Sequence, residues 1–275
     1  MSPRRLWLIA DDYALSPGVS EAILDLLALG RLSGTGCMTL FAEWPEAAAR
    51  LAEAPRDAAI GLHLTLTDQP ALSGRSVLAP EGRLPPLGRL LTLTATSAKA
   101  RRAAMEELEL QHARFVDVMG RTPDFVDGHQ HVHFLPAARR WLARLARRDG
   151  GRPFVRGAPA LAHAPRPVLA KTAIVRGMAR GFDRFASSHD LPVAGPLAGF
   201  YDWDGSGSFA AALADALERL PDGAVFMCHP GRVDPVLRER DRLQGPRMVE
   251  YDHLRSDAFG EALERSGATI ARMQR

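Results

Sequence analysis

The chain has 275 residues, of which 46% are hydrophobic and 24% charged, so it can bury a core as ordinary globular proteins do. Its formal net charge is only +3 and the basic residues are dispersed, which argues against a nucleic-acid partner. The apolar stretches are too short for a membrane span or a secretory leader, so we expect a cytoplasmic protein without a membrane span.

Short apolar segments alternate with helix-like segments along the chain. The apolar segments predict strands at 6–10, 35–41, 59–67, 124–126, 154–156, 197–203, 224–228 and 268–270. The intervening segments predict helices at 17–29, 44–54, 97–119, 136–148, 168–185, 208–220 and 256–265. Strands that alternate with helices indicate a mostly parallel sheet. We therefore expect one α/β domain over residues 1–275, and favour a distorted (β/α) barrel over a doubly wound sheet.

Two stretches do not follow this alternation. Residues 68–96 are rich in Pro, Gly and Leu without a sustained period, which favours a long insertion serving as a lid or a dimer arm. A homodimer is therefore one option. Residues 158–196 give no clear pattern beyond the helix expected at 168–185.

Acidic and histidine residues occur where several predicted strands end. Asp11 and Asp12 follow the first strand, His63 lies in the third, His129 follows the fourth and His229 the seventh. The carboxyl ends of parallel strands meet at one rim of an α/β barrel, and active sites are built there. The sequence therefore predicts that these side chains share one site.

The adjacent carboxylates Asp11 and Asp12 are expected to face different ways in an extended segment. One can then ligate a cation while the other stays free as a base. The alternative is an acidic pair that only stabilises the start of the following helix. His63 shares its strand face with Thr65 and Thr67, and this polar setting favours a ligand over a structural core histidine.

The stretch 127–133, DGHQHVH, is the most specific motif. Histidines two apart on an extended segment point to one side and can present ring nitrogens to one ion. His129 can ligate while His131 and His133 orient neighbours or bind substrate. Asp127 can hold a histidine ring by accepting its second N–H. One carboxylate and two imidazoles suit Mg, Zn, Mn or Co.

His229 stands between a predicted strand and the turn-forming Pro230 and Gly231, which would present its ring at the rim. Imidazole titrates near neutral pH, so it suits proton donation to a leaving group; a structural histidine is the alternative. The chain has no GxxxxGK[ST] phosphate loop and no GxSxG elbow. Their absence argues against P-loop nucleotide binding and against a serine hydrolase.

Taken in order, four motifs resemble the YdjC-like family of carbohydrate deacetylases, which includes chitooligosaccharide deacetylases. The motifs are Ala10-Asp11-Asp12-Tyr13, Gly61-Leu62-His63-Leu64, the stretch 127–133 and Cys228-His229-Pro230-Gly231. Tyr13-Ala14 stands where the family usually shows Phe-Gly, so the family's backbone shape is not carried over at this point.

The resemblance implies a barrel of the glycoside hydrolase and deacetylase type that holds a divalent metal, usually magnesium. Carried over by motif, Asp12, His63 and His129 are the metal ligands and Asp11 is the base. The implied reaction removes acetyl groups from N-acetylated sugars.

We therefore expect a metal-dependent hydrolase of linear amides whose substrate is an acetylated sugar or oligosaccharide. His229 is the candidate acid, while Arg156, Tyr201 and Asp202 are weaker candidates for sugar contacts or for orienting the base. Magnesium is the expected cation, with Zn, Mn or Co as alternatives. Two other functions stay open: a barrel hydrolase of phosphoesterase or amidohydrolase type, which often holds two metals, and a non-catalytic sugar-binding protein.

Overall fold

The computed structural model describes residues 3–148, 152–164, 166–203 and 208–273. Within these ranges the strands are β1 (Arg4–Tyr13), β2 (Gly34–Cys37), β3 (Ala59–Leu64), β4 (Phe125–Gly128), β5 (Phe154–Arg156), β6 (Val193–Ala194), β7 (Leu197–Ala198), β8 (Val225–Cys228) and β9 (Ala268–Ile270). The helices are α1 (Pro17–Ala28), α2 (Trp44–Arg50), α3 (Leu87–Thr96), α4 (Ala98–Met119), α5 (Pro136–Leu145), α6 (Leu169–Met178), α7 (Phe182–Ser188), α8 (Ser208–Arg219), α9 (Pro235–Arg240), α10 (Gly245–Arg255) and α11 (Asp257–Ser266).

The strands form one parallel sheet that curls into a barrel. Their hydrogen-bonded order is β6-β5-β4-β3-β2-β1-β8-β7, and β9 pairs with β1. Every pair in this order is parallel. A bridge between Pro159 and Leu197 joins the segment after β5 to β7, so the two edges of the sheet approach each other. The predicted (β/α) barrel is confirmed, in a nearly closed form.

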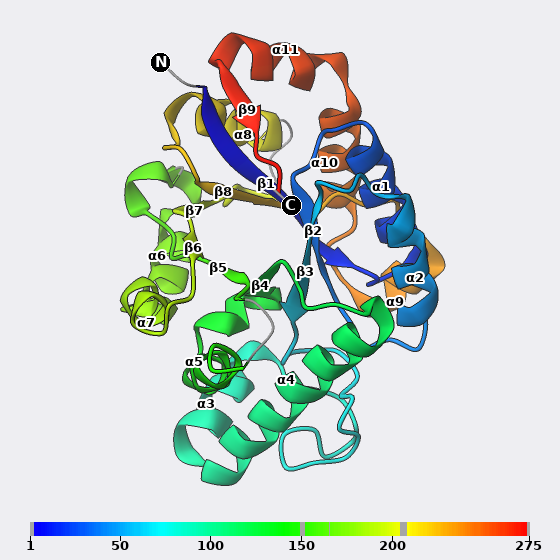
Figure 1. Cartoon of the computed structure of the whole chain (residues 1–275), viewed down its shortest axis with the longest axis vertical. Helices are drawn as coiled ribbons and strands as arrows, with labels where there is room; N and C mark the ends of the chain where they lie inside the picture. Colours follow the sequence, from blue (N-terminus) through cyan, green and yellow to red (C-terminus); the bar gives the residue numbers. More distant parts are fainter. Residues whose placement is uncertain (1–2, 149–151, 165, 204–207, 274–275) are drawn as a thin grey trace.

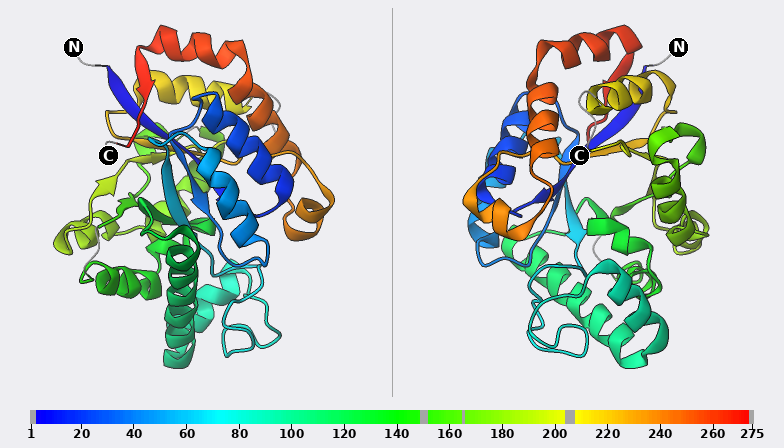
Figure 2. Two further views of the ribbon diagram at one scale, coloured as in Figure 1. Left: turned by 45° about the vertical axis from the view of Figure 1, so that its right-hand side comes forward. Right: turned by 180° about the vertical axis from the view of Figure 1, so that it is seen from behind.

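The helices form an outer layer around the strands (Figures 1 and 2). The helix α1 begins as predicted, because the Ser16 side chain accepts a hydrogen bond from the Val19 N–H and Pro17 follows at the first helical position. The long α4 is capped in the same way by Ser97, and Gly120 ends it in the left-handed region at φ 65°. Buried apolar side chains of strands and helices join in one core.

Several predicted elements need correction. The helix expected at 168–185 is two helices, α6 and α7, because Gly181 between them takes φ 71°, which no α-helix accommodates. The strand expected at 197–203 is only Leu197–Ala198. The stretch 68–96 contains the helix α3, although its role as an insertion stays a prediction. Helices α9 and α10 occupy a region between 228 and 256 for which we predicted no helix.

No helix within the described ranges is long and apolar enough to cross a membrane, as the sequence predicted.

The parallel order of the strands determines where the site can form. The strands β1, β3, β4, β5 and β8 all end at the same rim of the barrel. Any polar residue at the carboxyl end of these strands is thereby brought close to the others.

Candidate metal centre and active site

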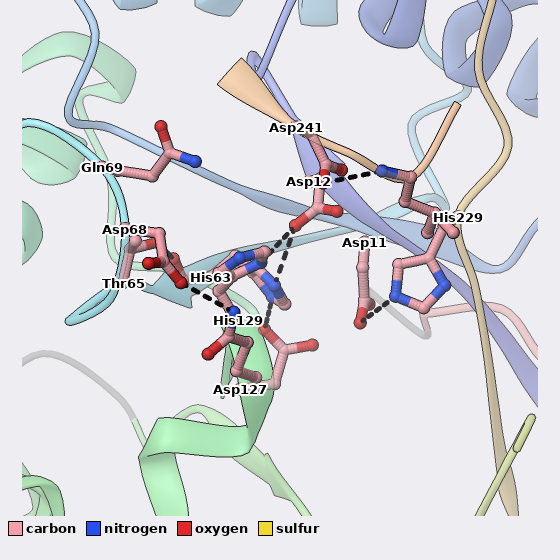
Figure 3. A network of polar contacts seen from close by, with 12 residues as sticks. Asp11, Asp12, His63, Thr65, Asp68, Gln69, Asp127, His129, His229 and Asp241 are labelled. Carbon is pink, nitrogen blue, oxygen red and sulfur yellow. Dashed lines mark hydrogen bonds and ion pairs between the residues drawn. The ribbon is translucent and has the colours of Figure 1, made fainter. Parts of the chain in front are cut away.

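The rim carries the side chains that the sequence singled out. Asp11 and Asp12 lie in the last part of β1, His63 lies near the end of β3, and His129 directly follows β4. His229 is the first residue after β8. Figure 3 shows these five side chains near one another, with Asp12 beside His63 and His129, and Asp11 beside His229.

Asp12 is the centre of the group. One of its carboxylate oxygens, Oδ1, lies 3.3 Å from Nε2 of His63 and 3.0 Å from Nδ1 of His129 (Figure 3). One donor atom from each of these three residues lies within 4.8 Å of the others, so they can share one metal ion. The backbone at Asp12 has φ 68°, and the register between β1 and β2 shifts between Ala10 and Tyr13.

Asp127 holds the ring of His63. The Nδ1 of His63 lies 2.6 Å from Asp127 Oδ1, in a contact buried from solvent. A carboxylate only accepts, so the proton of this hydrogen bond belongs to His63 Nδ1. The Nε2 atom is thereby left to face Asp12, which is the arrangement that metal-ligating histidines usually have.

The histidine motif is not extended, contrary to the sequence prediction. Residues His129–Phe134 form a 3-10 turn in which Gln130 and His131 take the left-handed conformation, at φ 49° and 61°. The turn sends the three histidines in different directions. The ring of His131 lies 5.5 Å from the ring of Phe200, and His133 is fully buried against Phe134. Only His129 of the three joins Asp12.

A buried guanidinium occupies the space behind Asp11. The Nη1 and Nη2 atoms of Arg156 donate to the two Asp11 oxygens at 2.8 and 2.5 Å, and Nη2 also contacts Asp127 Oδ2. Asp11, His63 and Asp127 form a second group with metal-ligand spacing. Arg156 contacts two of these three residues, so positive charge is already supplied there.

Arg247, which the sequence analysis missed, contacts Asp12 from the other side. Its Nη2 donates to Asp12 Oδ2 at 2.6 Å and to Asp241 Oδ2 at 2.5 Å, and the side chain is 1% exposed. The two central carboxylates therefore each have their own arginine.

The ionisable side chains of the site shift one another's pKa values strongly, because they are buried close together. Burial alone would raise the pKa of Asp11, but Arg156, His63 and His229 together outweigh it and lower the pKa to about 2. For Asp12, burial is again outweighed, here by His129 and Arg247, and the pKa is held well below its usual range. Both carboxylates are thus ionised at neutral pH.

His229 approaches Asp11 from β8. Its Nε2 lies 3.8 Å from Asp11 Oδ2, and its side chain is 15% exposed (Figure 3). Burial, which disfavours the charged ring, lowers the pKa of His229 to about 4. The ring is therefore neutral at neutral pH and its Nε2 faces a carboxylate at the edge of the site.

The weaker candidates for sugar contacts or for orienting the base differ in how deeply they are buried. Tyr201 is 4% exposed and its hydroxyl donates to Glu250 at 2.5 Å, whereas Asp202 is exposed. Glu250 also accepts the backbone N–H of His229, and the sequence had not indicated it. Arg156, in contrast, is in direct contact with Asp11.

The donor set fits a divalent cation. It offers one carboxylate oxygen and two imidazole nitrogens, a combination of hard and borderline ligands. Burial would lower the pKa of His63, but Asp127 and Asp11 outweigh it and raise the pKa to about 10. The carboxylates around His63 therefore favour positive charge at this point, as a cation site requires.

Comparison with known proteins shows which family the chain resembles. A family model described as YdjC-like protein matches residues 5–265. A chitooligosaccharide deacetylase of Citrobacter koseri is 28% identical over 273 residues, which cover 96% of each chain. A carbohydrate deacetylase of Mus musculus is 32% identical over 245 residues, covering 82% of this chain and 78% of its own length.

Among solved structures, an Enterococcus faecalis protein described as a proposed cellobiose-phosphate cleavage protein superposes with a TM-score of 0.74 at 22% identity. The match covers 98% of this chain and 97% of that one. At this identity the likeness shows that the two chains share a fold.

Proposed function

Because the chain belongs to the YdjC-like protein family, we propose that it is a metal-dependent deacetylase of N-acetylated sugars or oligosaccharides. The observation that carries the proposal is the convergence of Asp12, His63 and His129 on one point beside Asp11 and His229. The names of the two deacetylase relatives support the acetylated sugar as the substrate class.

Asp12, His63 and His129 would hold the metal, with magnesium as the expected ion and Zn, Mn or Co as alternatives. A divalent cation supplies Lewis-acid polarisation of the acetyl carbonyl and makes water more acidic. Asp127 and Arg247 keep the ligands oriented, because each contacts a ligand side chain directly.

Asp11 acts as the base, taking a proton from the attacking water on its carboxylate. Arg156 fixes this carboxylate through two hydrogen bonds, so that it cannot turn away from the site. The Nε2 of His229 lies 3.8 Å from Asp11 Oδ2, just beyond hydrogen-bond distance. A small approach of the two groups in the substrate complex would let the ring receive the proton and pass it to the departing amine nitrogen. Water and amide thereby give acetate and amine.

An exposed aromatic side chain near His229 supports a sugar as the substrate. Trp203 is 37% exposed, and its ring lies 5.9 Å from the ring of His229. The Lys171 ammonium lies over one face of the indole, 3.5 Å from the ring centroid, so only the other face is left to contact a sugar ring. We propose that Trp203 contacts the substrate.

The position of Arg156 favours one metal over two. A binuclear phosphoesterase or amidohydrolase site would need a second ion near Asp11 and Asp127, where the Arg156 guanidinium already lies. We therefore expect one bound metal per chain.

The proposal is tested by acetate release from acetylated chitooligosaccharides. The protein is stripped with a chelator, dialysed, and assayed with Mg, Zn, Mn or Co added separately. We expect no release without metal, restored release with at least one metal, and one equivalent of metal per chain. Sugar binding without acetate release under all four metals would instead indicate a non-catalytic protein, and two equivalents would indicate a binuclear hydrolase.

A further inference from the structure

A buried carboxylate lies on the side of His229 that faces away from Asp11. Glu250, on α10, is completely buried. Its Oε1 lies 4.0 Å from Nδ1 of His229, while Asp11 Oδ2 lies 3.8 Å from Nε2 of the same ring. The imidazole therefore stands between two carboxylates, one beside each ring nitrogen.

Glu250 is fixed where it stands. The Tyr201 hydroxyl donates to its Oε1 at 2.5 Å, and the backbone N–H of His229 donates to its Oε2. The turn after β8 is further attached to α10, because the Gly231 N–H donates to the Arg247 carbonyl at 3.0 Å. The Glu250 carboxylate is therefore held in a fixed position relative to the backbone of His229.

The ring nitrogen of His229 that lies nearer to Glu250 is Nδ1. This atom is buried, and within the described part of the chain it has no hydrogen-bond partner. A separation of 4.0 Å is too long for a hydrogen bond, but at that range a buried carboxylate interacts strongly with a ring charge. It also favours the tautomer with the proton on Nδ1, which leaves Nε2 free to face Asp11.

We propose that Glu250 is a positioning residue for His229, which keeps a proton on Nδ1 and stabilises the imidazolium formed when Nε2 takes up a proton. The inference rests on the proposed function, because that function makes His229 the proton carrier. The carried proton moves from Asp11 to Nε2 and then to the departing nitrogen, while Glu250 neither gains nor loses one. Tyr201 acts indirectly, because its hydroxyl donates to the Glu250 carboxylate and holds it in place.

The test compares E250Q with wild type at pH 8, where the Glu250 carboxyl is ionised, on two substrates, an N-acetylated chitooligosaccharide and 4-nitrophenyl acetate. The amine of the sugar must be protonated to leave, whereas 4-nitrophenolate leaves without a proton. We expect E250Q to lower kcat on the sugar by about 10-fold to 100-fold with KM nearly unchanged, and to change ester hydrolysis by less than about threefold. The control is D252N, which removes an exposed carboxylate from the same helix and is expected to behave as wild type.

Two further variants separate positioning from a folding defect. If Glu250 acts through His229, the double variant H229A/E250Q has the same kcat as H229A alone. Y201F leaves the carboxylate in place but loosens it, so we expect a smaller loss that is again confined to the sugar.

Equal losses on sugar and ester, a further loss in the double variant, or wild-type kcat in E250Q would each overturn the role of Glu250 while the deacetylase activity of the wild type stands. Absence of acetate release from the wild type would instead overturn the proposed function itself.

Discussion

At the scale of single residues, buried charges are paired across the site. Asp11 is paired with Arg156, and Asp12 with Arg247. A buried charge that loses its partner is costly, so each pair resists substitution of either member. His229 is neutral at neutral pH, because burial lowers its pKa to about 4, so its substitution breaks no buried ion pair.

We predict that H229A lowers kcat for acetylated sugars by about 10²-fold to 10⁴-fold, the usual contribution of an acid–base group. Metal affinity should stay at the wild-type value, because His229 lies outside the group formed by Asp12, His63 and His129. Steady-state kinetics and calorimetric titration with metal measure the two quantities. An H229A protein with full kcat would show that proton transfer does not depend on this ring.

A second residue-scale prediction concerns the pH dependence of stability. Burial raises the pKa of Glu250 from 4.5 to about 7. Its contribution to stability is therefore complete below pH 4.5 and is lost as the pH rises through 7, by roughly 3 kcal/mol in total. E250Q cannot ionise, so its free energy of unfolding should fall less between pH 5 and pH 8 than that of wild type. Urea unfolding at both pH values measures this, and parallel curves would contradict the raised pKa.

The site residues that could be predicted from the sequence and those that could not differ in the kind of element that carries them. Asp11, His63 and His229 were found because each lies at an apolar strand, whose carboxyl end has a known place in a barrel. Arg247 and Glu250 were missed because their helix α10 reverses the usual pattern. It buries these two charged residues while its Met248 and Val249 are 46% and 50% exposed.

At the scale of elements, the regular apolar strands were predictable and the stretches fixed by backbone conformation were not. The strand β5 was predicted with its observed bounds. The turn His129–Phe134 was predicted as extended, because alternating histidines look like a strand. Its left-handed Gln130 and His131 have no sequence signal, since neither position is a glycine.

The contact between β2 and β3 allows a prediction at this scale. A Cβ atom on Gly34 would lie 2.0 Å from the carbonyl oxygen of Ala59, a backbone atom that cannot easily move. G34A should therefore destabilise the protein by about 1–3 kcal/mol, the usual range for overpacking. The matched control is G88A in α3, where nothing lies within 4 Å of the added atom. Thermal unfolding should show a lower midpoint for G34A alone; equal midpoints would contradict the close approach.

At the scale of the whole molecule, the proposed metal links separate parts of the barrel. Its ligands come from β1, β3 and the turn after β4. An ion bound by all three stabilises the folded chain only, because the unfolded chain does not bring them together.

We predict that saturating metal raises the unfolding temperature. At 100 times Kd the gain is about 2.7 kcal/mol, which corresponds to roughly 5–10 °C for a chain of this size. H129A loses one ligand whose side chain is 15% exposed, so it should fold but show a clearly smaller shift. Differential scanning calorimetry with and without each metal measures this. An equal shift in H129A and wild type would place the ion elsewhere.

The place of β1 in the sheet has a consequence for how the protein is made. Trp7 pairs with Val225 on β8, and Arg4 pairs with Ala268 on β9, so two of the three neighbours of β1 are synthesised long after it. While the ribosome is still producing the middle of the chain, one flank of this apolar strand has no native partner. Pairing between strands far apart in sequence slows folding and leaves aggregation-prone apolar segments exposed. Expression in the cell should therefore depend on chaperones that shield β1 during synthesis.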